Sequence, residues 1–189
     1  MSVLRPTVDE AYDSGSGLGG NRDYFSMLGT TWDEARDAVA TERSLLAAHD
    51  GDPVAAQAAH GARVEEEEEQ GDPWLAGLDV GVAGAVHALS AAGVLTVASC
   101  NGAAGHHEGA PVVAFTADAD RLAAVLALAA ESGLQADDSG NWTVLDGPLD
   151  GFGSLADRLI ASAGTFDAME QPRPYDDDTA EEPLYPSWS

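Results

Sequence analysis

In the segment VLTVASCNGAAGHHEGAPVVAFTA, residues 94–117, two apolar runs flank a polar loop. Residues 94–100 and 111–117 are rich in β-branched and other apolar side chains, which is typical of buried strands. Strands that lie this close in the sequence usually pair with each other as a hairpin. The segment therefore predicts two neighbouring strands of one sheet.

The sequence before this segment predicts a helix that packs closely on its neighbours. Asp79 is a suitable N-cap and Gly93 a suitable end for the run DVGVAGAVHALSAAG. Val82, Val86 and Leu89 recur at helical spacing and predict one apolar stripe toward the core. The small residues of this run would let another backbone approach, which offsets the cost of about 1 kcal/mol for a glycine inside a helix.

The sequence after the segment predicts one helix, one hairpin and a last helix. Asp118 is expected to cap a helix that ends at Gly133. Residues 134–146 predict a hairpin with its turn at Asp138–Asn141, and Ser154 is expected to begin the last helix. The resulting order is α-β-β-α-β-β-α. This order predicts an α+β fold in which helices cover a four-stranded antiparallel or mixed sheet.

Two additional helices are expected before this core. Thr31 and Glu34 have the spacing of a capping box at the start of a helix over residues 32–48. Asp52 and Pro53 are suited to begin a second helix, which ends in a run of glutamates. These signals predict a helical extension in front of the sheet-forming part of the chain.

The chain is expected to form a single α+β domain over residues 31–164. Within this domain, residues 31–71 are the helical extension and residues 72–164 the core. A Gly- and Ser-rich arm at residues 1–30 is expected to be flexible, and an acidic, proline-rich tail at residues 165–189 is expected to be disordered.

The charge of the chain excludes several classes of partner. The 189 residues carry a formal net charge of −25, from 33 acidic residues against 8 basic ones, all of them arginine. Nucleic-acid binding depends on cations placed against phosphates, so we expect neither a nucleic-acid partner nor an anionic membrane surface. The apolar runs are shorter than the ~20 residues of a membrane span. A single cysteine fits a reducing compartment, and a cytoplasmic location is expected.

The acidic charge has three interpretations: solubility, attraction of a basic protein such as a toxin, or mimicry of nucleic acid. Residues 79–164 contain ten acids and two arginines, a net charge of −8, so the rest of the chain carries −17. Charge concentrated outside the core is typical of solubilising or tethering sequence. The alternative is that the acidic surface of this chain binds a basic protein partner.

The loop between the first two strands contains the residues best suited to chemistry. Cys100 ends the first strand, and His106, His107 and Glu108 precede the second. Ten residues, 101–110, separate the strands, whereas hairpin loops usually have about two to five. Glycines in the loop would allow the histidines to return toward the cysteine. A loop of this length and composition favours a functional role.

Three interpretations of the loop are open. Cys100, His106, His107 and Glu108 supply thiolate, imidazole and carboxylate groups, which are the common ligands of zinc. Alternatively, Cys100 is a catalytic nucleophile that His106 activates, with Glu108 orienting the imidazole ring. The third interpretation is a loop that binds a ligand without chemistry or that has a purely structural role.

Three further residues are candidates for ligand binding. Asn101 and the backbone amide of Gly102 could stabilise an anionic oxygen. His87 could join them because its helix leads directly into the strand of Cys100. As a single histidine on a helix of small residues, it could equally form an ordinary hydrogen bond on the flank of that helix.

The run GLDVGVAGAVHALSAAGVLTVASCNG, followed by GHHEGAPVVAF, resembles a group of bacterial α+β proteins that combine such a helix with SCNG and HHE motifs. The likeness covers about residues 77–163, and its specific parts are residues 99–102 and 106–108. No activity is assigned to that group, so the resemblance implies no chemistry. A fainter likeness, in the Ser-Cys-x-Gly turn, is to the wybutosine-synthesis family of transfer-RNA modification proteins, whose RNA partner requires a basic surface that this chain lacks.

Two function hypotheses follow. The first is a small cytoplasmic domain that binds a divalent metal such as zinc, or a small molecule, at the loop and could catalyse hydrolysis or group transfer. The second is an acidic interaction protein, such as an inhibitor or immunity protein, that binds a basic protein partner. The sequence leaves open whether the protein is an enzyme.

Overall fold

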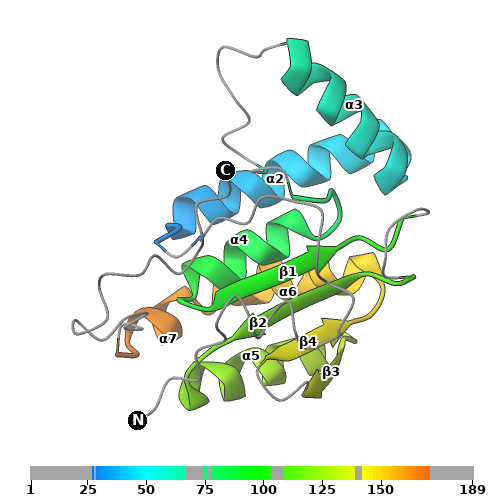
Figure 1. Cartoon of the computed structure of the whole chain (residues 1–189). Helices are drawn as coiled ribbons and strands as arrows, with labels where there is room; N and C mark the ends of the chain where they lie inside the picture. The colour runs from blue at the N-terminus through cyan, green and yellow to red at the C-terminus, as the bar shows by residue number, and fades with distance from the viewer. Residues whose placement is uncertain are drawn as a thin grey trace, which may run out of the picture.

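The computed structural model describes residues 27, 29–66, 75, 78–103, 109–138 and 142–170, and for residues 63–66 the backbone alone. The described residues form an α+β fold with the predicted element order (Figure 1). The elements are α2 (Trp32–Ala48), α3 (Pro53–Glu66), α4 (Ala83–Ala91), β1 (Leu95–Cys100), β2 (Val112–Thr116), α5 (Ala119–Glu131), β3 (Gln135–Asp138), β4 (Thr143–Asp146), α6 (Leu149–Ala161) and α7 (Ala163–Asp167).

The four strands form one antiparallel sheet in the order β1-β2-β4-β3. Each predicted hairpin pairs its own two strands, and β2 pairs with β4 to join the hairpins. In β1, an irregularity between Thr96 and Ala98 shifts the register against β2 by one residue. The predicted fold class is thus confirmed, and the sheet is antiparallel.

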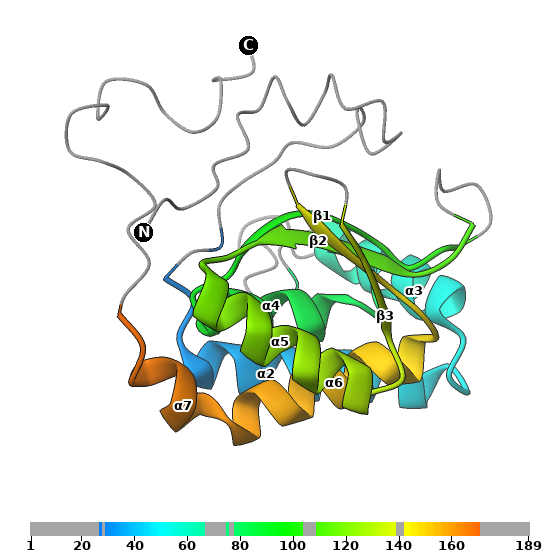
Figure 2. The ribbon, with the colours of Figure 1, turned by 90° about the horizontal axis from the view of Figure 1, so that it is seen from below.

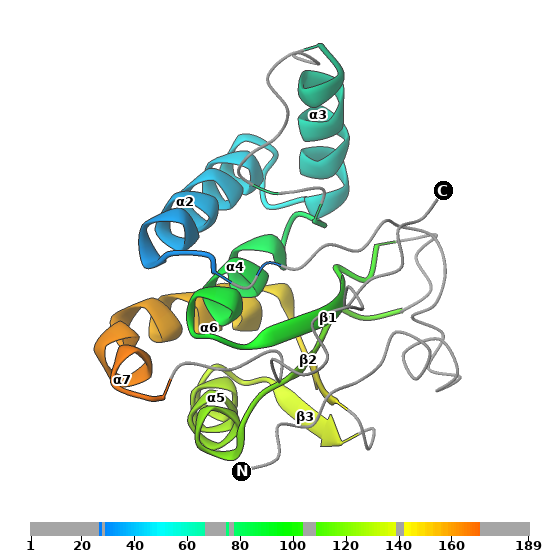
Figure 3. The same ribbon diagram turned by 60° about the vertical axis from the view of Figure 1, so that its left-hand side comes forward.

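Helices α2, α4, α5, α6 and α7 lie on one side of the sheet (Figures 2 and 3). The central helix α6 contacts both α4 and α5, while α4 also contacts β1 and α5 contacts β3. Val113, Phe115 and Leu145 point toward these helices and join their core. Since side chains directly opposite each other on paired strands share a face, Cys100 and its partner Val112 point toward the other face, here called the outer face.

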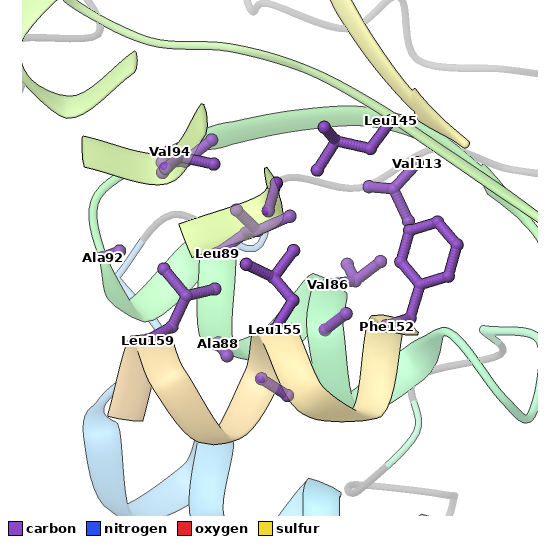
Figure 4. Close-up of a cluster of buried hydrophobic side chains, with 14 of the residues drawn as sticks. Val86, Ala88, Leu89, Ala92, Val94, Val113, Leu145, Phe152, Leu155 and Leu159 are labelled. Carbon is purple, nitrogen blue, oxygen red and sulfur yellow. The ribbon is translucent and has the colours of Figure 1, made fainter. Parts of the chain in front are cut away.

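Helix α4 lies at the centre of the hydrophobic core (Figure 4). Val86 and Leu89 pack with Leu155 of α6 and Leu145 of β4. The prediction of a single apolar stripe on α4 is too narrow, because every residue from Ala83 to Ser90 is buried. The reason is that α2 and α6 both pack on the sides of α4 that the sheet does not cover.

The N-terminal helices begin where the capping signals predict. The Thr31 hydroxyl accepts a hydrogen bond from the Glu34 amide, and the Glu34 carboxylate accepts one from the Thr31 amide, which is the predicted capping box. In α3, the Asp52 carboxylate accepts hydrogen bonds from the amides of Val54 and Ala55. Helix α2 packs on α4 and α6, and α3 packs on α2.

Close contact between α2 and α4 depends on Gly84, as the small-residue composition predicts. A Cβ atom at Gly84 would lie 2.9 Å from Cγ2 and 3.3 Å from Cα of Val39, and 2.7 Å from Oε2 of Glu42. Real Cβ contacts are seldom so short, so a side chain at this position would push the two helices apart.

The last helix begins earlier than predicted. Helix α6 starts at Leu149 with Pro148 as its N-cap, five residues before Ser154. The sequence GPLDGFG suggests a loop because of its glycines, but Gly151 is buried inside the helix. A Cβ atom there would lie 2.8 Å from Cδ2 of Leu134 and 3.0 Å from the Ser132 carbonyl oxygen, so close packing of the helix on the start of β3 requires glycine.

The short helix α7 extends into the segment predicted as a disordered tail. Phe166 in α7 is buried and contacts the ring of Trp32. The predicted tail boundary at residue 165 is therefore too early, and the remainder of the tail from residue 171, like nearly all of the predicted arm at residues 1–30, lies outside the described residues. Among the described helices, none combines the length and apolar character needed to cross a bilayer.

Candidate functional site at the β1–β2 connection

Cys100 is the last residue of β1 and points toward the outer face of the sheet. Its side chain is buried, with 8% of the residue surface exposed. The Gly102 amide donates a hydrogen bond to Sγ of Cys100 at 3.3 Å. The thiol is therefore hydrogen-bonded to the first residues of the loop that leads toward His106–Glu108.

Asn101 fixes the base of the loop from the opposite side. Because side chains alternate along a strand, Asn101 points toward the helices, where 4% of its surface is exposed. Its Nδ2 donates to the Val80 carbonyl oxygen at 2.9 Å, and its Oδ1 accepts from the Ala103 amide at 3.0 Å. Its backbone amide donates to Oδ2 of Asp79 at 3.3 Å. Asn101 thus holds the loop base, and its predicted role in ligand binding stays a prediction.

Gly102 closes the loop base because no other residue fits its position. Its φ of +70° lies in the left-handed region, and a Cβ atom there would be 2.5 Å from the carbonyl carbon of Ala110 and 2.7 Å from the nitrogen of Pro111. The outgoing and returning chains are therefore in contact at Gly102 and Ala110. This contact reduces the effective loop to the seven residues 103–109.

Three of the predicted site residues lie outside the described part of the chain. These are His106, His107 and Glu108. Their predicted proximity to Cys100 stays a prediction, as do the zinc and nucleophile interpretations that depend on it. Among the described residues, no group of three or more His, Cys, Asp or Glu side chains is placed to hold a metal ion.

His87 lies apart from Cys100. It is buried within α4, on the side of the sheet that the helices cover, whereas Cys100 points to the outer face. Hydrogen bonds from Thr31 lower the pKa of Glu34 at the start of α2, and the charge of His87 adds a smaller effect in the same direction. The sheet therefore lies between α4, which carries His87, and the face toward which Cys100 points.

Glu42 is a buried charged residue that the sequence analysis missed. It lies on α2 with 5% of its surface exposed, and its Oε1 accepts a hydrogen bond from the Gly81 amide at 2.7 Å. Its Oε2 accepts one from the Gly84 amide at 3.1 Å. Burial raises the pKa of the Glu42 carboxyl above its usual value, although these hydrogen bonds and the charge of Arg43 oppose the rise.

Glu42 also provides the N-terminal cap that was predicted for Asp79. The N-cap residue of α4 is Val82, which makes no side-chain capping bond. The carboxylate of Asp79 instead accepts from the Asn101 amide, while its backbone oxygen accepts from the amides of Val82 and Ala83. The free amides at the start of α4 are satisfied by a carboxylate from another helix, which suits the positive end of the helix dipole.

Each arginine whose side chain is described is in an ion pair with a carboxylate. These pairs are Arg36–Asp33, Arg43–Asp157, Arg121–Asp118 and Arg158–Glu131. Among the described residues, the carboxylates outside these four pairs are therefore in excess over the arginines.

Chemically, the described part of the site offers one thiol at the end of β1 and a hydrogen-bonded loop base. The sequence that follows supplies two imidazoles and a carboxylate. Comparisons with protein-family models, with curated proteins and with solved structures find no match for this chain.

Proposed function

We propose that the protein binds a divalent metal ion such as zinc, or failing that a small ligand, at the β1–β2 connection. The candidate metal ligands are Cys100, His106, His107 and Glu108, and Cys100, His106 and Glu108 are the candidates for any catalysis of hydrolysis or group transfer. A cytoplasmic location is part of this proposal. The observation that carries it is the buried hydrogen-bond network of Asn101 at the base of the loop.

The network supports a functional loop because a short apolar turn could join the strands at lower cost. Asp79 and Asn101 are both buried, and burying polar groups costs free energy unless each finds a hydrogen-bond partner. Here two of the hydrogen bonds join Asn101 to the turn at Asp79 and Val80, and the third joins Asn101 to Ala103 within the loop. Long loops on rigid supports are the usual carriers of binding residues.

The donor types support a borderline metal. Thiolate and imidazole are preferred by Zn²⁺, and three protein ligands with one open position are typical of a catalytic zinc site. From Gly102, His106 is only four residues along the chain. Four residues span at most ~14 Å, so the length of the chain keeps the His106 imidazole within reach of the Cys100 thiol.

Calorimetric titration of the tag-free protein with Zn²⁺ tests this proposal. The wild type is expected to bind one ion per chain, and Cys100→Ser and the double variant His106→Ala/His107→Ala are each expected to weaken binding at least about tenfold. His49→Ala, which removes the histidine at the C-cap of α2, is the matched control and should bind as the wild type does. Equal affinity in all four proteins, or no binding, would contradict the metal site.

Alkylation kinetics separate the thiol nucleophile from the metal ligand. A nucleophile activated by His106 should react rapidly with iodoacetamide near neutral pH, and His106→Ala should slow the reaction. A structural thiol with the burial of Cys100 should react only when the protein unfolds.

A second function, binding of a basic protein partner, is favoured by the pairing of every described arginine side chain with a carboxylate. Such a surface presents its uncompensated carboxylates to the solvent. The immobilised protein should then retain a cationic partner at low ionic strength and release it as salt is added, because salt screens exposed charges. If no basic protein is retained at low salt, this function is excluded.

A further inference from the structure

A continuous series of hydrogen bonds connects helix α2 with the base of the β1–β2 loop. It starts at the Glu42 carboxylate, which accepts from the amides of Gly81 and Gly84. The Gly81 amide and the Val80 carbonyl belong to the same peptide group, and this carbonyl accepts a hydrogen bond from Nδ2 of Asn101. Asn101 then accepts from the Ala103 amide through Oδ1. Helix α2 is thereby linked to the first residues of the loop.

We infer that Glu42 is a proton-sensitive positioning residue, which holds the turn at residues 79–84 against α2 and through that turn sets the base of the β1–β2 loop. If the loop binds a ligand, as in the proposed function, the protonation of Glu42 also changes the affinity for that ligand, and this part of the inference rests on the proposed function. The link itself does not, because it consists of described hydrogen bonds. In this arrangement, protonation of one buried carboxylate on α2 changes the geometry at the other end of the turn.

Glu42 is suited to such a role because its carboxylate is buried, with 5% of the residue surface exposed. A carboxylate that accepts several backbone amides at a helix N-terminus forms strong, charge-assisted hydrogen bonds. Protonation removes the charge and turns one carboxylate oxygen into a hydroxyl donor. The amides of Gly81 and Gly84 are donors themselves, so they cannot accept a hydrogen bond from this hydroxyl. Since burial raises the pKa of Glu42, this change occurs at a higher pH than for an exposed glutamate.

Other titratable groups near this contact must be distinguished from Glu42. Arg43 follows it on α2 and pairs with Asp157 of α6. Asp79 lies in the turn itself and accepts from the Asn101 amide. The buried histidines of the neighbouring helices are His60 on α3 and His87 on α4.

The test follows the backbone amide signals of the ligand-free protein by nuclear magnetic resonance as a function of pH. In the wild type, the signals of Gly81, Gly84, Asn101 and Ala103 are expected to shift with one common midpoint above 4.5, the ordinary value for a glutamate. Glu42→Gln keeps the shape of the side chain but cannot ionise. It should abolish the common transition and speed amide exchange at Asn101 and Ala103 by about tenfold.

Glu34→Gln is the matched control, because Glu34 lies on the same helix but belongs to the exposed capping box. It should leave the common transition unchanged. A transition at Gly81 and Gly84 that is absent at Asn101 and Ala103 would overturn the link. A transition at Asn101 that persists in Glu42→Gln would show that a group other than Glu42 causes it, which also overturns the proposal. Neither result depends on zinc or any other ligand, so failure here is distinct from failure of the proposed function.

Discussion

At the scale of single residues, the loop base depends on a glycine in a conformation that other residues avoid. Gly102→Ala would force a Cβ atom into the backbone of Ala110 and Pro111 while φ stays at +70°. We expect it to lower the free energy of unfolding by about 2–3 kcal/mol, measured by urea denaturation. Gly109→Ala is the matched control in the same loop, because a Cβ atom there meets nothing within 4 Å. Equal stability of the two variants would contradict the described loop closure.

Arg121 is a second residue whose burial predicts a large effect. Its Nε donates to the Ala92 carbonyl at 2.9 Å and Nη2 donates to the Glu170 carbonyl at 2.7 Å, while Nη1 pairs with Asp118. Arg121→Met would leave these acceptors without their donor, and we expect a loss of about 3–5 kcal/mol on thermal or urea unfolding. Arg36→Met removes an exposed pair and should cost at most about 1 kcal/mol.

The residue scale also shows what sequence reasoning misses. Ala35, Ala38, Val39 and Glu42 are the buried residues of α2, and their spacing places Glu42 on the apolar stripe. An acid on such a stripe is a signal for a buried, hydrogen-bonded carboxylate. Its partners, the amides of Gly81 and Gly84, lie about forty residues further along the chain, so they become apparent only once the helices are packed.

At the scale of secondary-structure elements, replacing a helical glycine by alanine should have opposite effects at the α2–α4 contact and at an open position of α6. Gly84→Ala would bring a Cβ atom against Val39 and Glu42, and overpacking of this kind costs about 1–3 kcal/mol. Gly153→Ala, inside α6, meets nothing within 4 Å and should stabilise the protein by about 0.5–1 kcal/mol through helix propensity. Thermal unfolding of both variants checks the pair. Stabilisation by Gly84→Ala would contradict the described helix contact.

Element boundaries were predictable where local hydrogen bonds determine them. The boundaries of α2 follow from Thr31 and Glu34 and from the turn at Gly51, and the start of α5 follows from Asp118, which accepts from the Arg121 amide. The start of α6 was not predictable in this way, because Gly151 is tolerated in the helix only through its contact with Leu134. The start of α4 likewise depends on Glu42 from another helix.

The candidate site was predictable only in part. The strand end at Cys100 and the turn at Gly102 follow from local sequence, and the structure describes both. That Asn101 and Cys100 point to opposite faces follows from strand alternation, but the partners of Asn101 come from the distant turn at Asp79 and Val80. His106–Glu108 lie outside the described residues, so their role stays a prediction.

At the scale of the whole molecule, the excess negative charge predicts a dependence of stability on salt. A net charge of −25 repels itself more strongly in the compact state than in the unfolded chain. The exposed ion pairs each contribute at most about 1 kcal/mol. Screening should therefore raise the melting temperature as NaCl is added at neutral pH, measured by differential scanning calorimetry. A melting temperature that falls with salt would show that ion pairs outweigh the repulsion.

Two carboxyl groups give the whole molecule opposite responses to acid. Burial alone would raise the pKa of Asp118, but hydrogen bonds and the charge of Arg121 outweigh it and lower the pKa below 3.8. The stability that Asp118 contributes is thus present above that value and is lost as the pH falls through its folded-state pKa. The raised pKa of Glu42 has the opposite effect on stability, because the folded state binds the proton more readily than the unfolded chain does. The stability that protonated Glu42 contributes is therefore present at low pH and is lost as the pH rises through its folded-state pKa.

Chemical denaturation of Glu42→Gln between pH 4.5 and neutral pH measures the second response. The stability of the wild type relative to this variant should decrease as the pH rises through the folded-state pKa of Glu42. A relative stability that increases over this range would mean that ionised Glu42 is better solvated in the folded protein than in water.

We propose that the thiol at the end of β1 and the imidazoles of the following loop bind one divalent metal ion, and the absorption spectrum of the cobalt-loaded protein is the decisive test. Co²⁺ occupies zinc sites and shows an intense near-ultraviolet charge-transfer band when a thiolate is among its ligands. We predict this band in the wild type, its loss in Cys100→Ser, and its weakening in His106→Ala/His107→Ala. A wild-type protein that shows no thiolate-to-cobalt band at saturating Co²⁺ would contradict the claim.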